Sequence, residues 1–308
     1  MSIEPVAAAP LLTRPHDGSV LNGMLLMCLG VAMFTGMDAL AKWQAERYDV
    51  LQIVFFRSAF GIVPMLPLLL RGGVRRLLHT RRLGLHLLRG AIGTVSLITF
   101  FLAYRYLELA DAIVLSFASP LFMTALSVPI LGEAVGWRRW TAIGVGFAGV
   151  IVMVQPGGDL FTLLALLPIF GAFTYALVGV TIKILSRTEE SVTIVFFFSV
   201  FAALISGVAL PFVWVTPADL SDWLGQIFIG LIGGVAQLAM TQAFRLAPVS
   251  AIAPFDYSAV IWATLIGYWV WGDLPSTWTW AGAVLVVGSG LYILQRETSL
   301  ARKARATA

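Results

Sequence analysis

The two halves of this chain repeat each other at a nearly constant spacing. The segment IVFFRSAF at 53–60 returns as IVFFFSVF at 194–201, which is 141 positions later. Further matches at an offset of 140 or 141 pair Gly30 with Gly171, Lys42 with Lys183, Gly90 with Gly230, Gly93 with Gly233 and Trp137 with Trp278. Each copy is long enough for five membrane spans. Because five is an odd number, the second copy must lie in the membrane in the opposite sense to the first.

The composition is that of a membrane protein. Hydrophobic residues make up 59% of the 308 residues and charged residues 12%, whereas a soluble domain averages about 25% charged residues. A helix needs about 20 apolar residues to cross the hydrocarbon. We therefore predict an all-α integral membrane protein with ten transmembrane helices, in two inverted five-helix repeats. The predicted spans are 21–42, 50–70, 86–105, 110–131, 138–154, 160–183, 191–214, 223–244, 249–271 and 277–294.

The distribution of lysine and arginine predicts the orientation. With the N-terminus in the cytoplasm, 16 of the 20 basic residues lie inside or at the inner boundary, so both termini are expected to be cytoplasmic. The expected parts are a cytoplasmic tail (1–20), a first repeat (21–154), a second repeat (160–294) and a basic cytoplasmic tail (295–308). We expect a multi-pass protein of the bacterial inner (cytoplasmic) membrane. The arginine-rich run 71–89 is interpreted as a topology anchor, with lipid binding or a gate as alternatives.

Ionisable side chains inside spans are costly in lipid and usually face a cavity. Three fall within the predicted spans: Asp38 late in the first, Arg57 in the second and Asp256 in the ninth. Arg57 stands where the other repeat has Phe198. A guanidinium stays charged and binds carboxylates or phosphates with two parallel hydrogen bonds. Arg57 would thus bind an anionic substrate group or pair with Asp38; the alternative is an interfacial arginine.

The two aspartates favour different interpretations. Asp256 follows Pro254, which removes a helix hydrogen bond and can open a kink, so its carboxylate is a candidate cation or proton site. The alternative is a buried structural acceptor. Asp38 precedes Lys42 by four residues on one helix face, which is the spacing of an ordinary ion pair.

Aromatic and amide side chains in the spans are further candidates for a binding cavity. An aromatic lining would suit a ring-bearing or cationic substrate, although a single aromatic residue in a membrane helix more often contacts lipid or the core. With the three charged residues, the full candidate set is Asp38, Arg57, Tyr104, Phe117, Tyr175, Gln237, Asp256, Tyr257 and Trp262.

The sequence does not support an ATP-driven transporter, a metalloprotein or a nucleic-acid-binding protein. The sequence has no Walker A loop, which argues against ATP-driven transport within this chain. The three histidines lack metal-ligand spacing, and the single cysteine, Cys28, excludes an internal disulfide. No cofactor, metal site or catalytic residue is therefore predicted. Since the basic residues gather in particular loops, the net charge of +4 does not indicate nucleic-acid binding.

The motifs together resemble the drug/metabolite transporter (DMT) superfamily, EamA type. Besides the two five-span halves, the resemblance rests on Phe55-Phe56-Arg57, on Leu131-Gly132-Glu133 after the fourth span and on Trp271-Gly272-Asp273 after the ninth. Within the family, the pattern is most similar to bacterial members of S-adenosylmethionine and riboflavin uptake type. Those of S-adenosylmethionine type have a basic residue between two aromatics in the ninth span, whereas here Phe255 and Tyr257 flank Asp256.

The resemblance implies a central site between the repeats and alternating access, with a coupling proton or an exchanged metabolite. The sequence thus predicts a secondary active transporter, and not an enzyme, for a small zwitterionic or aromatic metabolite such as S-adenosylmethionine, riboflavin or an amino acid. A membrane-embedded enzyme and a scaffold or sensor without flux are the alternatives. The expected partners are the substrate and the lipid bilayer, and small residues at 142–149 would suit a homodimer interface.

Overall fold

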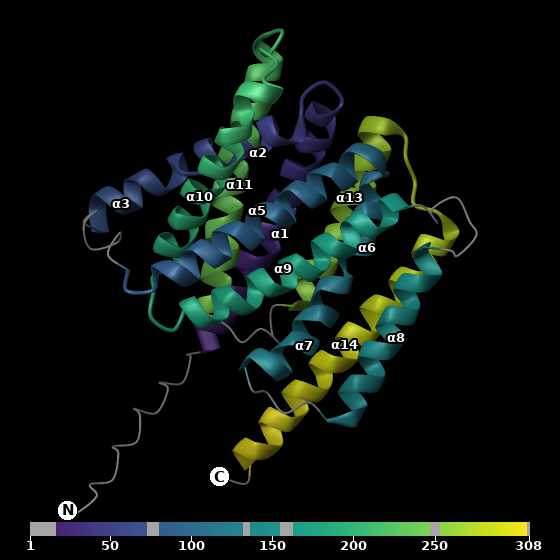
Figure 1. Cartoon of the computed structure of the whole chain (residues 1–308). Coiled ribbons are helices and arrows are strands. Elements are labelled where there is room, and N and C mark those ends of the chain that lie inside the picture. Colours follow the sequence, from purple (N-terminus) through teal and green to yellow (C-terminus); the bar gives the residue numbers. More distant parts are fainter. Residues whose placement is uncertain (1–16, 73–79, 132–135, 155–162, 247–252, 307–308) are drawn as a thin grey trace, which may run out of the picture.

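The structure is a computed structural model that describes residues 17–72, 80–131, 136–154, 163–246 and 253–306 (Figure 1). These described residues form helices and connecting turns, with no strand among them. The first half of the chain contains α1 (Asp17–Ala45), α2 (Val50–Phe60), η1 (Val63–Met65), α3 (Leu66–Gly72), α5 (Leu83–Tyr106), α6 (Leu109–Ser116), α7 (Ala118–Leu131) and α8 (Trp137–Val154). The second half contains η2 (Leu163–Ala165), α9 (Leu166–Leu185), α10 (Ser191–Val213), α11 (Leu220–Leu246), η3 (Ala253–Ser258), α13 (Ala259–Trp271) and α14 (Thr277–Ala306).

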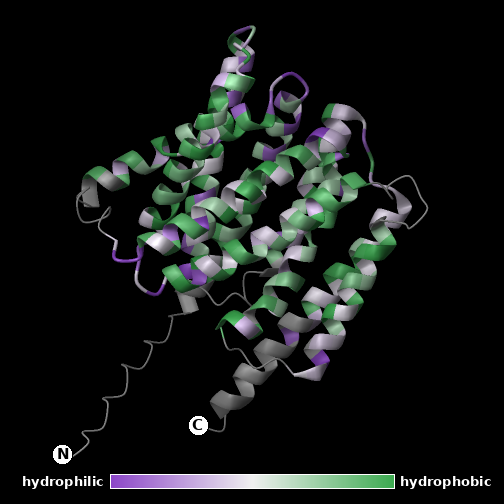
Figure 2. Ribbon diagram, viewed as in Figure 1, coloured by the Kyte–Doolittle hydropathy of each residue, from purple (hydrophilic) through white to green (hydrophobic). Residues whose placement is uncertain are grey.

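Seven helical segments among the described residues are long and apolar enough to cross a membrane. They are Leu21–Ala45, Val50–Leu68, Leu83–Tyr106, Leu109–Leu131, Leu163–Leu185, Ser191–Val213 and Leu220–Leu246, and a shorter apolar helix covers Trp140–Met153. Figure 2 shows apolar residues along the helices and hydrophilic residues at several of their ends and connections. The chain is therefore a multi-pass membrane protein, in which helices satisfy most of their backbone hydrogen bonds internally.

Both terminal helices extend beyond the predicted spans. The predicted N-terminal tail covers 1–20, but α1 already begins at Asp17; residues 1–16 lie outside the described part. α14 continues past residue 294 to Ala306, because Ala, Arg and Lys are good helix formers even where the sequence is polar. Hydropathy thus marks the apolar stretch, whereas propensity decides where the helix ends.

The predicted span 50–70 is divided into α2, η1 and α3, and the predicted spans 110–131 and 249–271 are each broken in their first half. α6 ends at Ser116 and α7 begins at Ala118, and Pro120 in the first turn of α7 has no N–H to continue the ladder. In the second half, Pro254 lies in the short 3₁₀ helix η3, which precedes α13. These last two breaks lie together, because Phe117 contacts Tyr257 edge to face with ring centroids 5.1 Å apart.

Helices of the first half pack mainly against helices of the second half. α1 packs on α11 and α5 packs on α9, while α2 lies against its repeat counterpart α10 and α8 against its counterpart α14 (Figure 1). The α2–α11 contact is a close backbone approach, since a Cβ at Gly234 would lie 2.9 Å from the Cα of Gly61. Part of the small-residue face at 142–149 is used inside the chain, because a Cβ at Gly149 would be 2.9 Å from the carbonyl oxygen of Gly282.

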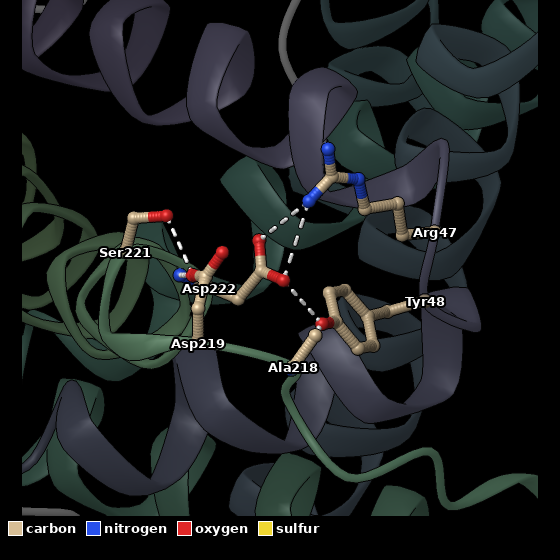
Figure 3. A network of polar contacts seen from close by, with 6 residues as sticks. All are labelled: Arg47, Tyr48, Ala218, Asp219, Ser221 and Asp222. Atoms are coloured by element: carbon tan, nitrogen blue, oxygen red, sulfur yellow. Dashed lines mark hydrogen bonds and ion pairs between the residues drawn. The ribbon is translucent and has the colours of Figure 1, made fainter.

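A polar network joins the α1–α2 turn to the start of α11 (Figure 3). The Tyr48 hydroxyl donates to Oδ2 of Asp222 at 2.6 Å and accepts from the Ala218 amide at 3.1 Å. Arg47 adds a 3.4 Å ion pair to Asp222, and the Asp222 amide donates to Asp219 at 2.9 Å. Burial raises the pKa of Tyr48, and its hydrogen bond to Asp222 acts in the same direction. The network therefore holds a neutral phenol on a buried carboxylate.

We expect Asp222→Ala to lower the free energy of unfolding by about 1–3 kcal/mol, because it leaves the buried Tyr48 hydroxyl without its acceptor. Arg47→Ala should cost less than about 1 kcal/mol, since the Arg47 side chain is 57% exposed and its ion pair is screened by solvent. Denaturant unfolding of the purified variants in detergent, followed by tryptophan fluorescence, measures both. Equal costs for the two variants would contradict this ranking.

Candidate functional site

A cavity of about 180 Å³ lies at the boundary between the two repeats. A single water needs about 10–15 Å³ by the same measure, so the cavity can admit an organic molecule. Residues from α1, α2, α5, α9, α10, α11 and η3 line it, together with the break between α6 and α7. Seven of the nine residues predicted from the sequence are among them: Asp38, Arg57, Tyr104, Phe117, Tyr175, Gln237 and Asp256.

Two predicted residues do not line this cavity. Tyr257 is buried behind Phe117; its hydroxyl has no hydrogen-bond partner in the described part of the chain and is packed close to Gly290. Trp262 lies further along α13 and is 38% exposed. In a helix of a membrane protein, such exposure indicates contact with lipid. Asp256 and Tyr257 both lie in the 3₁₀ helix η3, whereas Trp262 lies in α13, so the periodicity of a single α-helix does not relate the three positions.

Asp38 is bound to a tyrosine and forms no ion pair with either cation considered for it. The Tyr104 hydroxyl donates to Oδ2 of Asp38 at 3.2 Å. Lys42 instead donates to the Leu107 carbonyl at 2.7 Å and lies 5.4 Å from the centroid of the Trp271 ring. Among the described residues, neither Lys42 nor Arg57 lies within ion-pair distance of Asp38. The α1 carboxylate thus stays available to the cavity.

Arg57 is 4% exposed and has few polar contacts. Its Nη2 donates to Oε1 of Gln237 at 3.4 Å, a long hydrogen bond, and its Nε has no partner among the described residues. The guanidinium carbon lies 5.1 Å from the centroid of the Phe198 ring. Phe198 is the repeat counterpart of Arg57, so the two related positions meet at the wall of the cavity.

Arg89 is a cavity residue that the sequence prediction missed. The positive-inside rule counts it among the topology-setting arginines at the inner boundary, but it is 1% exposed and lines the cavity. Its guanidinium carbon lies 4.0 Å from the centroid of Phe198, on which Arg57 also packs. The signal available was its place on the helix: Gly90 and Gly93 follow it, and small residues on a membrane helix indicate close packing around that turn.

Asp256 reaches the cavity from η3. It is partly buried, and its carboxylate accepts no hydrogen bond from the described residues. The 3₁₀ turn is held by the Ser258 hydroxyl, which donates to the Phe255 carbonyl at 2.6 Å. Two carboxylates and two guanidiniums therefore line one largely apolar cavity, an arrangement that suits a small molecule carrying both charges.

No group of three or more His, Cys, Asp or Glu side chains that could hold a metal ion occurs among the residues that the structure describes. The cavity lining contains aspartate, arginine, amide, hydroxyl and aromatic groups instead. These groups can bind a polar organic molecule through hydrogen bonds and ring contacts.

Comparison with known proteins identifies the family. The model of the EamA-like transporter family matches residues 21–155 and again residues 162–295, which is nearly the whole chain in two copies. The chain belongs to the EamA-like transporter family. Gly272, one of the residues that carry the sequence resemblance, ends α13 with a left-handed backbone (φ 76°), which suits glycine. Its counterpart Gly132-Glu133 lies outside the described residues.

Relatives within the EamA family have been named as transporters. The chain is 31% identical to a riboflavin transporter of Vibrio cholerae, over 92% of this chain and 97% of the relative. It is 28% identical to an S-adenosylmethionine uptake transporter of Rickettsia prowazekii, over 90% and 94%, and 31% identical to a pseudopaline exporter of Pseudomonas aeruginosa, over 86% and 93%. These names point to a transporter rather than an enzyme.

A solved crystal structure shares the fold. It superposes with a TM-score of 0.66 at 19% sequence identity, covering 94% of this chain and 99% of the other. At this identity, the likeness extends to the fold alone.

Proposed function

We propose that this chain is a secondary active transporter that moves a small zwitterionic or aromatic metabolite across the bacterial inner membrane by alternating access. The observation that carries the proposal is the cavity between the two EamA repeats, lined by Asp38, Arg57, Arg89 and Asp256. Charged groups inside a membrane are costly and persist where they serve a substrate or ion pathway. Import and export are both represented among the relatives, so the direction is not part of the proposal.

Alternating access fits an inverted arrangement of the two repeats, which contacts between counterpart residues support. Residues related by a two-fold axis touch each other only near the axis, and two such pairs do so: Arg57 with Phe198, and Phe117 with Tyr257. The pairing of α1 with α11 and of α5 with α9 has the same symmetry. We infer that α8, the η3–α13 segment and α14 complete the ten spans, with both termini in the cytoplasm as the lysine and arginine bias predicts.

The proposed binding residues divide by chemistry. Asp38 and Asp256 would attract a cationic group or carry a coupling proton, and Arg57 would attract an anionic group. The remaining proposed residues, which supply ring faces and an amide, are Tyr104, Phe117, Tyr175 and Gln237. Tyr257 would act indirectly, by supporting Phe117 at the cavity wall, and Trp262 would face lipid.

Counterflow in proteoliposomes tests the proposal. Purified protein would be reconstituted in vesicles loaded in turn with S-adenosylmethionine, riboflavin, aromatic amino acids and nucleosides, with the labelled compound outside. We expect transient accumulation of one compound class and none in protein-free vesicles, because a carrier exchanges its substrate without net driving force.

Two other outcomes would contradict transport by this chain. Turnover of a compound by protein in detergent, without a vesicle, would favour a membrane-embedded enzyme. Folded protein that gives no counterflow with any class, but that retains a partner protein on purification, would favour a scaffold or sensor.

A further inference from the structure

Two guanidinium groups share one aromatic ring in the wall of the cavity. The guanidinium carbon of Arg57 lies 5.1 Å from the centroid of Phe198, and that of Arg89 lies 4.0 Å from the same centroid. They come from different helices, α2 and α5, and both line the cavity. Two like charges held this close repel each other, so a third group of opposite charge would stabilise the arrangement.

The two arginines have unused hydrogen-bond donors. Nε of Arg57 and both Nε and Nη1 of Arg89 are buried without a partner among the described residues. An unpaired buried donor costs about 1–3 kcal/mol, and more when it is charged. The Phe198 ring face attracts both charges but accepts no conventional hydrogen bond from these donors, whereas an anionic ligand with two oxygens could accept from both guanidiniums.

The backbone around the arginines provides room for them. A Cβ at Gly93 would collide with Nη1 of Arg89 and lie 2.8 Å from the Phe198 ring, and a Cβ at Gly233 would lie 3.3 Å from Nε of Arg57. Gly93 and Gly233 are repeat counterparts, so the glycine at this position of the first repeat leaves room for Arg89 and the glycine at the same position of the second repeat leaves room for Arg57. The counterpart of Arg89 is the buried Ile229, and that of Arg57 is Phe198. The first repeat alone therefore supplies the positive charge.

We infer that Arg57 and Arg89 together bind the carboxylate group of a zwitterionic substrate. The inference rests on the proposed transport function and names the part of the substrate that these two residues recognise. Asp38 and Asp256 lie in the same cavity, where they disfavour a multiply charged anion such as phosphate and suit the cationic group of a zwitterion. The mostly apolar remainder of the lining suits an organic body.

The test compares probes that differ only in the carboxylate. Full-length protein in detergent is titrated with S-adenosylmethionine and with its decarboxylated analogue, and with L-phenylalanine and L-phenylalaninamide, with binding followed by calorimetry. We expect at least one acid to bind at least about 30-fold more tightly than its partner without the carboxylate, the preference that a charged hydrogen-bonded pair provides. Arg89→Gln and Arg57→Gln should each remove most of that preference.

Matched variants separate this role from a structural one. Arg89→Lys retains the charge without the planar fork and should restore only part of the preference. Arg105→Gln, on the exposed side of the same helix α5, should leave it unchanged. Arg89→Gln should also raise the unfolding temperature of ligand-free protein, because it removes an unpaired buried charge; a purely structural arginine would lower it on removal.

The outcomes distinguish the inference from the proposed function. If every acid and its partner without the carboxylate bind equally, or if none binds, the inference is overturned, and counterflow with a compound lacking a carboxylate would leave the transporter proposal standing. Acid preference that survives in Arg89→Gln also overturns the joint role of the two arginines. Acid preference that needs both arginines, in protein without counterflow, would support the binding site and reject transport.

Discussion

Arg57→Ala and Asp256→Ala are each expected to reduce counterflow by about 100-fold or more. Each variant removes a charge that lines the cavity, and a lost charge-assisted contact costs about 3 kcal/mol, which corresponds to about two powers of ten in affinity. Neither residue forms an ion pair among the described residues, so the fold should survive both changes. Initial rates in proteoliposomes, at equal amounts of reconstituted protein, measure the effect.

The control matched to Arg57→Ala is Arg105→Ala, which removes an exposed positive charge from α5. The control matched to Asp256→Ala is Glu46→Ala, which removes an exposed negative charge just after the end of α1. Both should transport at the wild-type rate. Size-exclusion profiles and unfolding temperatures of all four variants show whether they remain folded. Normal flux in both Arg57→Ala and Asp256→Ala would remove these residues from the site.

Gly234→Ala is expected to lower the free energy of unfolding by about 3 kcal/mol, the upper part of the range for overpacking. The new Cβ would collide with the backbone of Gly61, where no side chain can rotate away, so α11 and α2 would have to separate. For a chain of this size, that cost corresponds to an unfolding temperature lower by about 5 °C. Thermal unfolding in detergent, read by tryptophan fluorescence, measures it.

Gly144→Ala is the control, because a Cβ there meets no atom within 4 Å and α8 gains a better helix former. Its unfolding temperature should stay the same or rise slightly. If the two alanine variants unfold at the same temperature, the close approach of α2 and α11 is not a major source of stability.

The candidate site was partly predictable because charge in an apolar span is conspicuous. Asp38, Arg57 and Asp256 are separated widely in the sequence, yet each was found by its cost in lipid, and each lines the cavity. Arg89 was missed for the opposite reason. It ends a run of arginines, where the positive-inside rule offers a sufficient explanation of any one of them. Only the packing of α5 against α9 and α10 distinguishes it from its neighbours.

The aromatic candidates show a second limit of predicting the site from the sequence. Tyr104 and Tyr175 line the cavity, whereas Trp262 is exposed, although all three are aromatic residues of apolar spans. Which side of a membrane helix faces lipid is weakly encoded, because lipid tails and a protein core accept the same side chains. The hydrophobic periodicity that orients helices of soluble proteins is therefore of little help here.

By itself, the sequence determined the membrane class, the internal repeat and the EamA family, because apolar length and a repeated pattern are properties of the chain alone. The tertiary structure decided which side chains meet. Arg57 and Arg89 come together on Phe198 only because α2, α5 and α10 pack at the boundary between the repeats. That packing depends on close approach at glycines such as Gly93 and Gly234, where a Cβ would collide with a neighbouring segment. No local sequence pattern predicts which distant segments come into contact.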